Sequence, residues 1–172
     1  MKILNCVSKG PIPSTSLRLV SLRGAKRRSN LFFFFILLSF SLSPAFGAVP
    51  QVCHKDNCVS VEVVSKDEDM ERGLMYRTGL DQDKGMIFVF PSDGKQQFWM
   101  KNMHFSLDML WISSDDRIVY IATNVPACTT DTCPTYSPDK AARFVLELNS
   151  GYTTTHQWKL GDILDLKGVF EK

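Results

Sequence analysis

The chain has 172 residues, with 20 Lys and Arg against 18 Asp and Glu, and a formal net charge of +2. Seven of the basic residues and none of the acids fall in the first 47 positions, so residues 48–172 carry a net charge of −5. A mildly acidic stretch of 125 residues has no basic patch for nucleic acid, and its length suits a single domain with one core.

Residues 1–47 have the pattern of a targeting segment that is removed. Their basic residues precede an apolar run at 31–38, and small residues at 45–47 predict cleavage near Ala48. The run is shorter than the roughly 20 residues of a membrane span. The domain would contact a membrane only through a leader that is not cleaved. We therefore expect a secreted or periplasmic domain at 48–172. The Ser and Arg content of the leader also suits a transit peptide, which leaves an organellar lumen as the alternative.

The first elements after the leader are a strand and a helix. Alternating Val residues at 59–64 predict a half-buried strand. The acidic run 67–69 supplies a cap and first turn for a helix that we expect to continue to Tyr76. Gly73 would lie in the middle of this helix, where it would permit close packing against a sheet.

The rest of the chain reads as short strands. The apolar run 86–90, between Gly85 and Pro91, predicts a strand buried on both faces and ending at the proline. A hairpin turn is expected at 115–116. Short strands with a single helix indicate a mainly β fold, a compact sandwich or barrel-like domain with one short helix packed on it. The further strands are expected at 96–101, 105–112, 117–122, 142–148 and 163–166.

Four cysteines of residues 48–172 form two pairs of equal spacing, Cys53 with Cys58 and Cys128 with Cys133. An even count in an exported chain favours disulfides. Four cysteines allow three pairings, of which the two local ones need the least rearrangement. The alternative is a four-thiolate zinc site, although zinc ligands are usually spaced more closely and would have to stay reduced.

Several short motifs span almost all of residues 48–172. Their residues are Arg72, Gly73, Leu74, Met75, Arg77, Gly85, Met86, Phe88, Phe90, Phe98 to Asn102, Leu107, Asp108, Val145 to Glu147, Gly161 and Asp162. In order and spacing these motifs resemble those of the DUF192 family. The resemblance implies a mainly β, sandwich-like fold with one helix, and it implies no activity because the family is a domain of unknown function. The loop from Val125 to Tyr136, with its two cysteines, resembles that of exported members.

The polar members of these motifs are candidates for a ligand site around Trp99 and Phe88. Asp108 lies in an apolar strand and needs a partner, for which Arg72, Arg77 and Lys101 are the candidates. A purely structural interpretation would place Trp99 in the core, with the Lys101 stem beside it and Asn102 at a turn. The candidate ligand-binding residues are Arg72, Arg77, Trp99, Lys101, Asn102, Asp108 and Glu147.

Such a site would hold a small polar ligand, an oligosaccharide or a peptide through its Arg and Lys side chains. We therefore expect a monomeric binding or accessory module, with no cofactor, no metal ligands and no assigned catalytic residue. Two other hypotheses are kept. Asp108 and Glu147 could form the carboxylate pair of a hydrolase. Met100, Met103, His104 and Met109 could bind copper.

Overall fold

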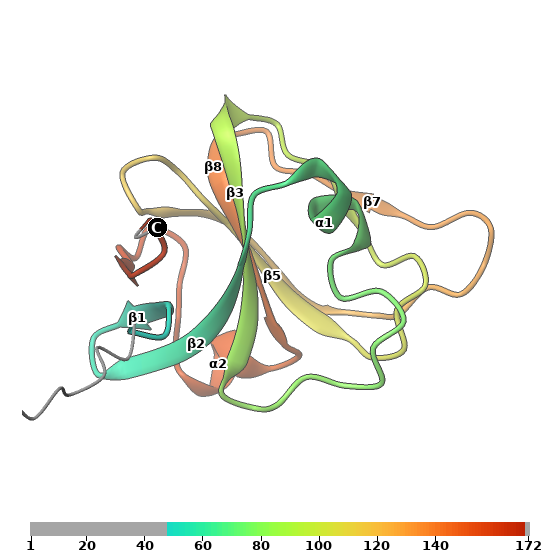
Figure 1. Cartoon of the computed structure of the whole chain (residues 1–172), viewed down its shortest axis with the longest axis horizontal. Helices are drawn as coiled ribbons and strands as arrows, with labels where there is room; N and C mark the ends of the chain where they lie inside the picture. The colour runs from blue at the N-terminus through green and yellow to red at the C-terminus, as the bar shows by residue number, and fades with distance from the viewer. Residues whose placement is uncertain (1–47, 171–172) are drawn as a thin grey trace, which may run out of the picture. The chain divides into compact units, whose positions relative to one another are not determined.

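Seven strands form one curled sheet in residues 48–170, the part of the chain that the computed structural model describes (Figure 1). The strand order is β6-β5-β8-β3-β2-β1-β9, and β4 pairs separately with β7. The predicted targeting segment lies outside the described residues. The elements are β1 (Gln51–His54), β2 (Asn57–Val64), α1 (Asp67–Arg72), β3 (Lys84–Gly94), β4 (Phe98–Trp99), β5 (Leu107–Ile112), β6 (Ile118–Val125), β7 (Thr135–Tyr136), β8 (Ala142–Asn149), α2 (Tyr152–Thr155) and β9 (Asp165–Lys167).

The mainly β class is confirmed, but the described residues contain two short helices where one was expected. The additional helix, α2, is only four residues long and contains three Thr, which have low helix propensity. The first helix is shorter than expected because it ends at Arg72. Gly73 follows with φ +46°, a conformation that side-chain-bearing residues rarely adopt, so it terminates the helix and does not lie within it.

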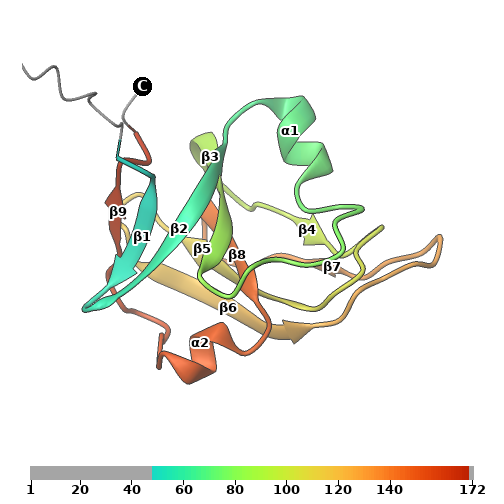
Figure 2. The same cartoon turned by 60° about the horizontal axis from the view of Figure 1, so that its bottom comes forward.

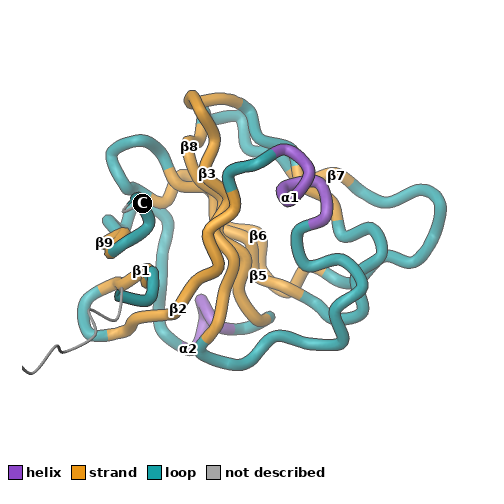
Figure 3. The backbone as a smooth tube through the Cα atoms, in the orientation of Figure 1, coloured by secondary structure: helices purple, strands orange, loops and turns teal. Residues whose placement is uncertain are grey.

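A crossover between two parallel strands places α1 over the sheet. β2 and β3 pair in parallel, and parallel neighbours cannot be joined by a tight turn. The chain therefore leaves β2, forms α1, and returns to β3 through the long loop that Figure 3 draws in teal. Figure 2 shows α1 on the side of the sheet where β4 and β7 also lie, while β1 and β9 run side by side at the other end.

The central strand β3 passes through Pro91, where the sequence predicted its end. Pro91 lies in the interval between Val89 and Gly94, where the register against β8 shifts, so the missing N–H does not interrupt regular pairing. The residues from Met86 to Phe88 are fully buried, as predicted, whereas Val89 and Phe90 are only partly buried.

The sheet separates two apolar clusters, since successive side chains of a strand point to opposite faces. Ile87, Leu110 and Leu146 belong to one cluster, which continues to Trp158. The other cluster contains the alternate positions of the same strands and every methionine of residues 48–172, and we call it the methionine cluster. Its methionines are the buried Met86, Met100, Met103 and Met109 and the partly buried Met70 and Met75.

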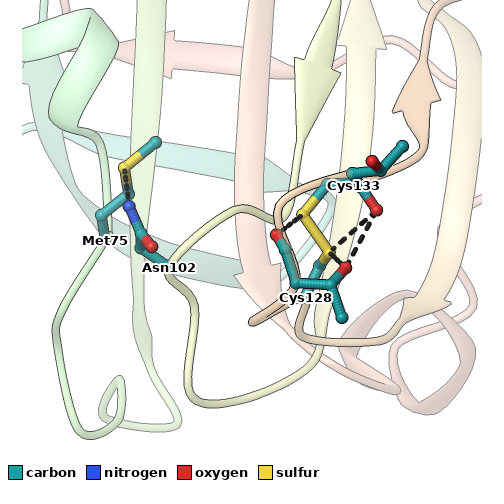
Figure 4. Close-up of a disulfide and its surroundings, with 6 residues drawn as sticks. Met75, Asn102, Cys128 and Cys133 are labelled. Atoms are coloured by element: carbon teal, nitrogen blue, oxygen red, sulfur yellow. Dashed lines mark hydrogen bonds between the residues drawn. A yellow bond between two sulfur atoms is a disulfide. The ribbon is translucent and has the colours of Figure 1, made fainter.

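Both predicted local disulfides are present. Cys53–Cys58 closes the hairpin of β1 and β2, and Cys128–Cys133 closes the loop between β6 and β7 (Figure 4). The zinc alternative is therefore wrong, because all four thiols are bonded to one another in pairs. Within residues 48–170, no helix has the length and apolar character needed to cross a membrane.

Candidate functional site

A pocket of about 290 Å³ opens on the methionine-cluster side of the sheet, beneath the end of α1. Its walls are mainly aromatic and sulfur-containing side chains, and one buried carboxyl group lies among them, in addition to the exposed carboxyl of Glu71 at the rim. The lining residues are Met70, Glu71, Arg72, Gly73, Leu74, Met75, Phe88, Phe90, Gln97, Phe98, Trp99, Met103 and Glu147.

The buried carboxyl group belongs to Glu147, the sixth of the eight residues of β8. Glu147 pairs across the sheet with Met86 on one side and Met109 on the other, so all three side chains share the pocket face. Only 6 % of the residue is exposed, and its Oε2 atom makes no hydrogen bond within the described residues. A buried acceptor without a donor is costly unless a partner or a proton satisfies it.

Burial raises the pKa of Glu147 from its ordinary 4.5 to about 8, because the charged form loses the solvation of water. The positive charge of Arg77 acts in the opposite direction but has the smaller effect. At neutral pH the carboxyl is therefore mostly protonated, and it can become a carboxylate when a cation or a set of donors arrives.

Aromatic rings form one wall of the pocket. Phe98 lies edge-on to Phe88, with ring centroids 4.9 Å apart, and edge-on to Phe90 at 6.3 Å. The structural interpretation that placed Trp99 in the core is wrong, because 46 % of this residue is exposed and it lines the pocket. The Lys101 ammonium lies over the indole, with Nζ 5.4 Å from the ring centroid.

The end of α1 forms the opposite wall and depends on Gly73. A Cβ atom at this position would lie 3.2 Å from Cζ of Phe88, closer than most real contacts. The close packing predicted for this glycine is therefore present, although it occurs at the end of the helix and not in its middle. Glu71 and Arg72 precede it and are exposed at the rim.

Asp108 is fully buried on the other face of the sheet and is completely hydrogen-bonded. Its Oδ1 accepts from the backbone N–H of Asn124 at 2.9 Å and of Gly151 at 3.1 Å. Its Oδ2 accepts from the backbone N–H of Thr153 at 3.0 Å and from the Thr153 hydroxyl at 2.6 Å. This carboxylate holds the start of α2 against the sheet.

The predicted basic partners of Asp108 are therefore wrong: within the described residues it forms no ion pair with Arg72, Arg77 or Lys101. Charge was not needed to compensate the buried acid, because four N–H and O–H donors do so. None of these donors could be identified from local sequence, since they lie on segments distant in the chain.

The two proposed hydrolase carboxylates face opposite sides of the sheet. Asp108 is paired with Leu148, and the next position along the strand, Met109, is paired with Glu147. Adjacent positions on a strand point to opposite faces, so Asp108 and Glu147 cannot address one bond. The hydrolase hypothesis built on this pair is wrong.

Two other candidate residues lie outside the pocket lining. Arg77 donates two hydrogen bonds to Glu62, at 2.6 and 2.8 Å, and these bonds hold the pKa of Glu62 below its ordinary value. Asn102 lies in a turn at φ +58° and donates to the Tyr76 hydroxyl at 2.8 Å. Asn102 therefore occupies a turn, as its structural interpretation predicted.

The four residues of the copper hypothesis do not form a surface site. Met100, Met103 and Met109 are buried in the methionine cluster, whereas His104 is exposed. Among residues 48–170, no group of three or more His, Cys, Asp and Glu side chains is arranged to hold a metal ion. The geometry gives no support to copper binding.

The disulfide loop is hydrogen-bonded to the segment that follows Trp99. The Cys128 N–H donates to the Met100 carbonyl, and the Asn102 N–H donates to the Cys128 carbonyl, both at 3.0 Å. The Asn102 side chain also contacts the sulfur of Met75, a lining residue (Figure 4). The loop that follows β6 is therefore connected to the segment that carries Trp99 and Met103.

Of the seven residues predicted from sequence, the structure brings Arg72, Trp99 and Glu147 together in one pocket, with Lys101 against Trp99. The sequence interpretation included Phe88 in the aromatic wall, but it missed other lining residues. The alternation of the strand could have identified Phe90, because Met86, Phe88 and Phe90 occupy alternate positions and share one face. The missed residues include Met70, Phe90, Phe98 and Met103.

The chain is similar to a known protein family and to solved structures. The family model of DUF192, described as Uncharacterized ACR, matches residues 50–166. A crystal structure from Sinorhizobium meliloti 1021, provisionally described as a transcription regulator, has 30% identity and a TM-score of 0.63, covering 69% of this chain and 92% of its own. A protein of unknown function from Novosphingobium aromaticivorans DSM 12444 has 26% identity and a TM-score of 0.61, with coverages of 72% and 89%. No curated protein matches the chain.

Proposed function

Because the chain belongs to the DUF192 family, whose members are described as uncharacterised, we propose its function from the geometry of the pocket. The domain is a binding module for a small ligand with an apolar body and a polar group that hydrogen-bonds to Glu147. The observation that carries this proposal is the buried Oε2 atom of Glu147, which has no partner in the described residues and belongs to a residue that lines an open pocket.

The size and lining of the pocket support a small ligand. A volume of about 290 Å³ is at the lower end of the range for small-molecule sites and suits a compound of one or two rings. Flexible Met70, Met75 and Met103 can adjust to the shape of an apolar group, and Phe98 and Trp99 offer rings for stacking. Among the ligand classes expected from sequence, these features favour a small molecule over an extended oligosaccharide or peptide.

We also propose that the domain works outside the cytosol, in the secreted or periplasmic space. Two disulfides in 125 residues support this, since such bonds persist in oxidising compartments. Expression of the full chain followed by fractionation should recover protein whose N-terminus lies near Ala48. Recovery of the intact chain from the cytosol, with reduced thiols, would contradict an exported location.

Regulation of transcription, the provisional description of the Sinorhizobium meliloti protein, is not proposed for this chain. Residues 48–172 have a net charge of −5, and direct binding to DNA depends largely on cations that neutralise phosphates.

Methionine methyl groups give a direct test of the binding function. The protein, labelled with ¹³C at the methionine methyl positions, is titrated with three probes of one shape: phenethylamine, phenethyl alcohol and phenylpropionate. We expect at least one probe to shift the signals of Met70, Met75 and Met103, which line the pocket. Met100 belongs to the same cluster but neither lines the pocket nor pairs with Glu147, so its signal serves as the internal control.

The binding function would be contradicted if none of the probes moved the lining signals at millimolar concentration. It would also be contradicted if lining and control methionines shifted equally, because this would indicate a diffuse effect on the core and not occupation of the pocket. Single Met→Leu substitutions at each position assign the signals.

A further inference from the structure

Resting on the proposed function, we propose that the ligand of this pocket is a primary or secondary organic amine, bound as its ammonium ion against the carboxylate of Glu147. The ammonium supplies N–H donors to the acceptor that has none, and the apolar body of the amine fills the space between the aromatic wall and α1. The binding function alone leaves the chemical class of the ligand open.

The charges around Glu147 leave its carboxyl uncompensated. The strands on either side of β8 place Met86 and Met109 next to it, and neither is charged. On α1, Glu71 and Arg72 are both exposed at the rim and carry opposite charges. A buried carboxylate in such surroundings is stabilised most by a cation that reaches it.

Arg77, the basic residue that lowers the pKa of Glu147, is already paired with another acid. The Arg77 guanidinium lowers the pKa of Glu147 only partly, and both of its terminal nitrogens are bonded to Glu62. Arg77 also lines a different pocket, together with Glu62 and Lys84. The pocket lining contains one basic side chain, the exposed Arg72. It therefore supplies no buried cation to pair with the buried acid of Glu147.

The aromatic wall also suits a cation. The faces of Phe and Trp rings attract positive charge, and Phe88, Phe98 and Trp99 all line the pocket. One such cation–π contact is already present, since the Lys101 ammonium lies 5.4 Å from the Trp99 ring centroid. An anionic ligand would instead place its charge beside the carboxyl of Glu147.

Binding of an amine should release a proton. The carboxyl of Glu147 has a pKa of about 8 and is mostly protonated at neutral pH, whereas the ammonium ion favours the carboxylate. The O–H bond of the carboxyl breaks, the proton goes to solvent, and the ligand keeps its own charge. Affinity should therefore rise about tenfold per pH unit until the pH reaches the pKa of Glu147.

Calorimetric titration with the same three probes tests this inference. Phenethylamine, whose ammonium stays charged as that of Lys does, should bind at least tenfold more tightly than phenethyl alcohol at about pH 8. Its affinity should rise from about pH 6 to about pH 8, with proton release measured in buffers of different ionisation enthalpy. The alcohol and phenylpropionate should show no such rise.

Two Glu→Gln variants complete the test. Glu147→Gln should lose the preference for the amine and its pH dependence, while the shape of the pocket is kept. Glu68→Gln, at an exposed position of α1 outside the pocket lining, should behave as the parent protein does.

The amine inference would be overturned if the alcohol or phenylpropionate bound as tightly as the amine, or if the affinity for the amine did not change with pH. In those cases the methionine signals of the lining would still respond, and the binding function would stand. Absence of any response from those signals with all three probes would overturn both.

Discussion

The carboxylate of Asp108 and the residue Thr153 are joined twice through one oxygen: Oδ2 of Asp108 accepts from both the backbone N–H and the hydroxyl of Thr153. The contact connects β5 to α2 across 45 positions of the chain. Without this carboxylate, a four-residue helix containing three Thr would have little tendency to form.

Replacement of Asp108 by Asn should therefore destabilise the domain. The amide keeps the shape but presents N–H₂ to donors that need an acceptor, and loss of charged hydrogen bonds in a buried site costs about 2–4 kcal/mol. The midpoint of urea unfolding should fall accordingly. Asp139→Asn, the same change at a fully exposed position, should leave the midpoint within about 0.5 kcal/mol of the parent. An equal effect of the two substitutions would contradict this role of Asp108.

Glu147 should make the stability of the domain depend on pH. Its folded pKa of about 8 lies above its ordinary 4.5, so the folded state binds more protons than the unfolded state between these values. The free energy of unfolding should fall as pH rises through this window, with a slope of up to about 1.4 kcal/mol per unit, and level off above it.

Glu147→Gln should remove this contribution, so the variant should be more stable than the parent at about pH 8 and similar at about pH 4. Chemical unfolding at several pH values measures the difference. Glu68→Gln is the matched control, because its carboxyl is exposed on α1. A constant difference between Glu147→Gln and the parent at every pH would mean that the carboxyl is not held protonated.

Gly73 and Gly79 form a second matched pair. Gly73→Ala must place a side chain at φ +46° and within 3.2 Å of the Phe88 ring, so we expect a loss of about 2 kcal/mol or more. Gly79→Ala meets nothing within 4 Å and has no positive φ, so its effect should be neutral or slightly stabilising. Thermal unfolding measures the stability of both variants. Similar losses of stability would show that the contact with Phe88 does not determine the cost of the Gly73 substitution.

The two disulfides should differ in their effect on the pocket and not in their effect on stability. Each closes a loop with a sequence separation of 5, so replacement of either pair by Ser should cost about 2 kcal/mol in the chain-entropy model. Only the Cys128–Cys133 loop is hydrogen-bonded to the segment from Met100 to Asn102.

The double variant Cys128→Ser with Cys133→Ser should therefore shift the methyl signal of Met103. The double variant Cys53→Ser with Cys58→Ser should leave that signal unchanged, because its hairpin lies outside the pocket lining. Identical methionine spectra for the two double variants would show that the disulfide loop does not support the pocket.

Much of the fold could be predicted because it follows from local pattern. The strand at 86–90, the turn at 115–116 and both disulfides depend on residues close in sequence, where alternation, turn chemistry and loop closure apply directly. The structural interpretation of Trp99 as a core residue failed for a physical reason: β4 is only two residues long and is followed by the turn at Asn102, so the alternation expected of a longer strand does not apply.

The candidate site was predicted only in part, since it depends on contacts between distant segments. Glu147 could be identified as an acid in an apolar strand, but its face depended on pairing with Met86 and Met109. Asp108 has the same sequence character and the opposite role, because its neighbours across the sheet bring N–H donors. Periodicity cannot separate two such acids before the strand order is known.

The division of the core by the sheet has a consequence for how this chain can vary. The cluster around Ile87, Leu110 and Leu146 packs behind the sheet, while Met70, Met103 and their neighbours form the pocket in front of it. Substitutions at distant sites that share no partner act almost independently. Exchange of pocket residues should therefore leave the rear cluster packed as before, so relatives with the same fold can differ in the pocket while the rear of the molecule stays the same.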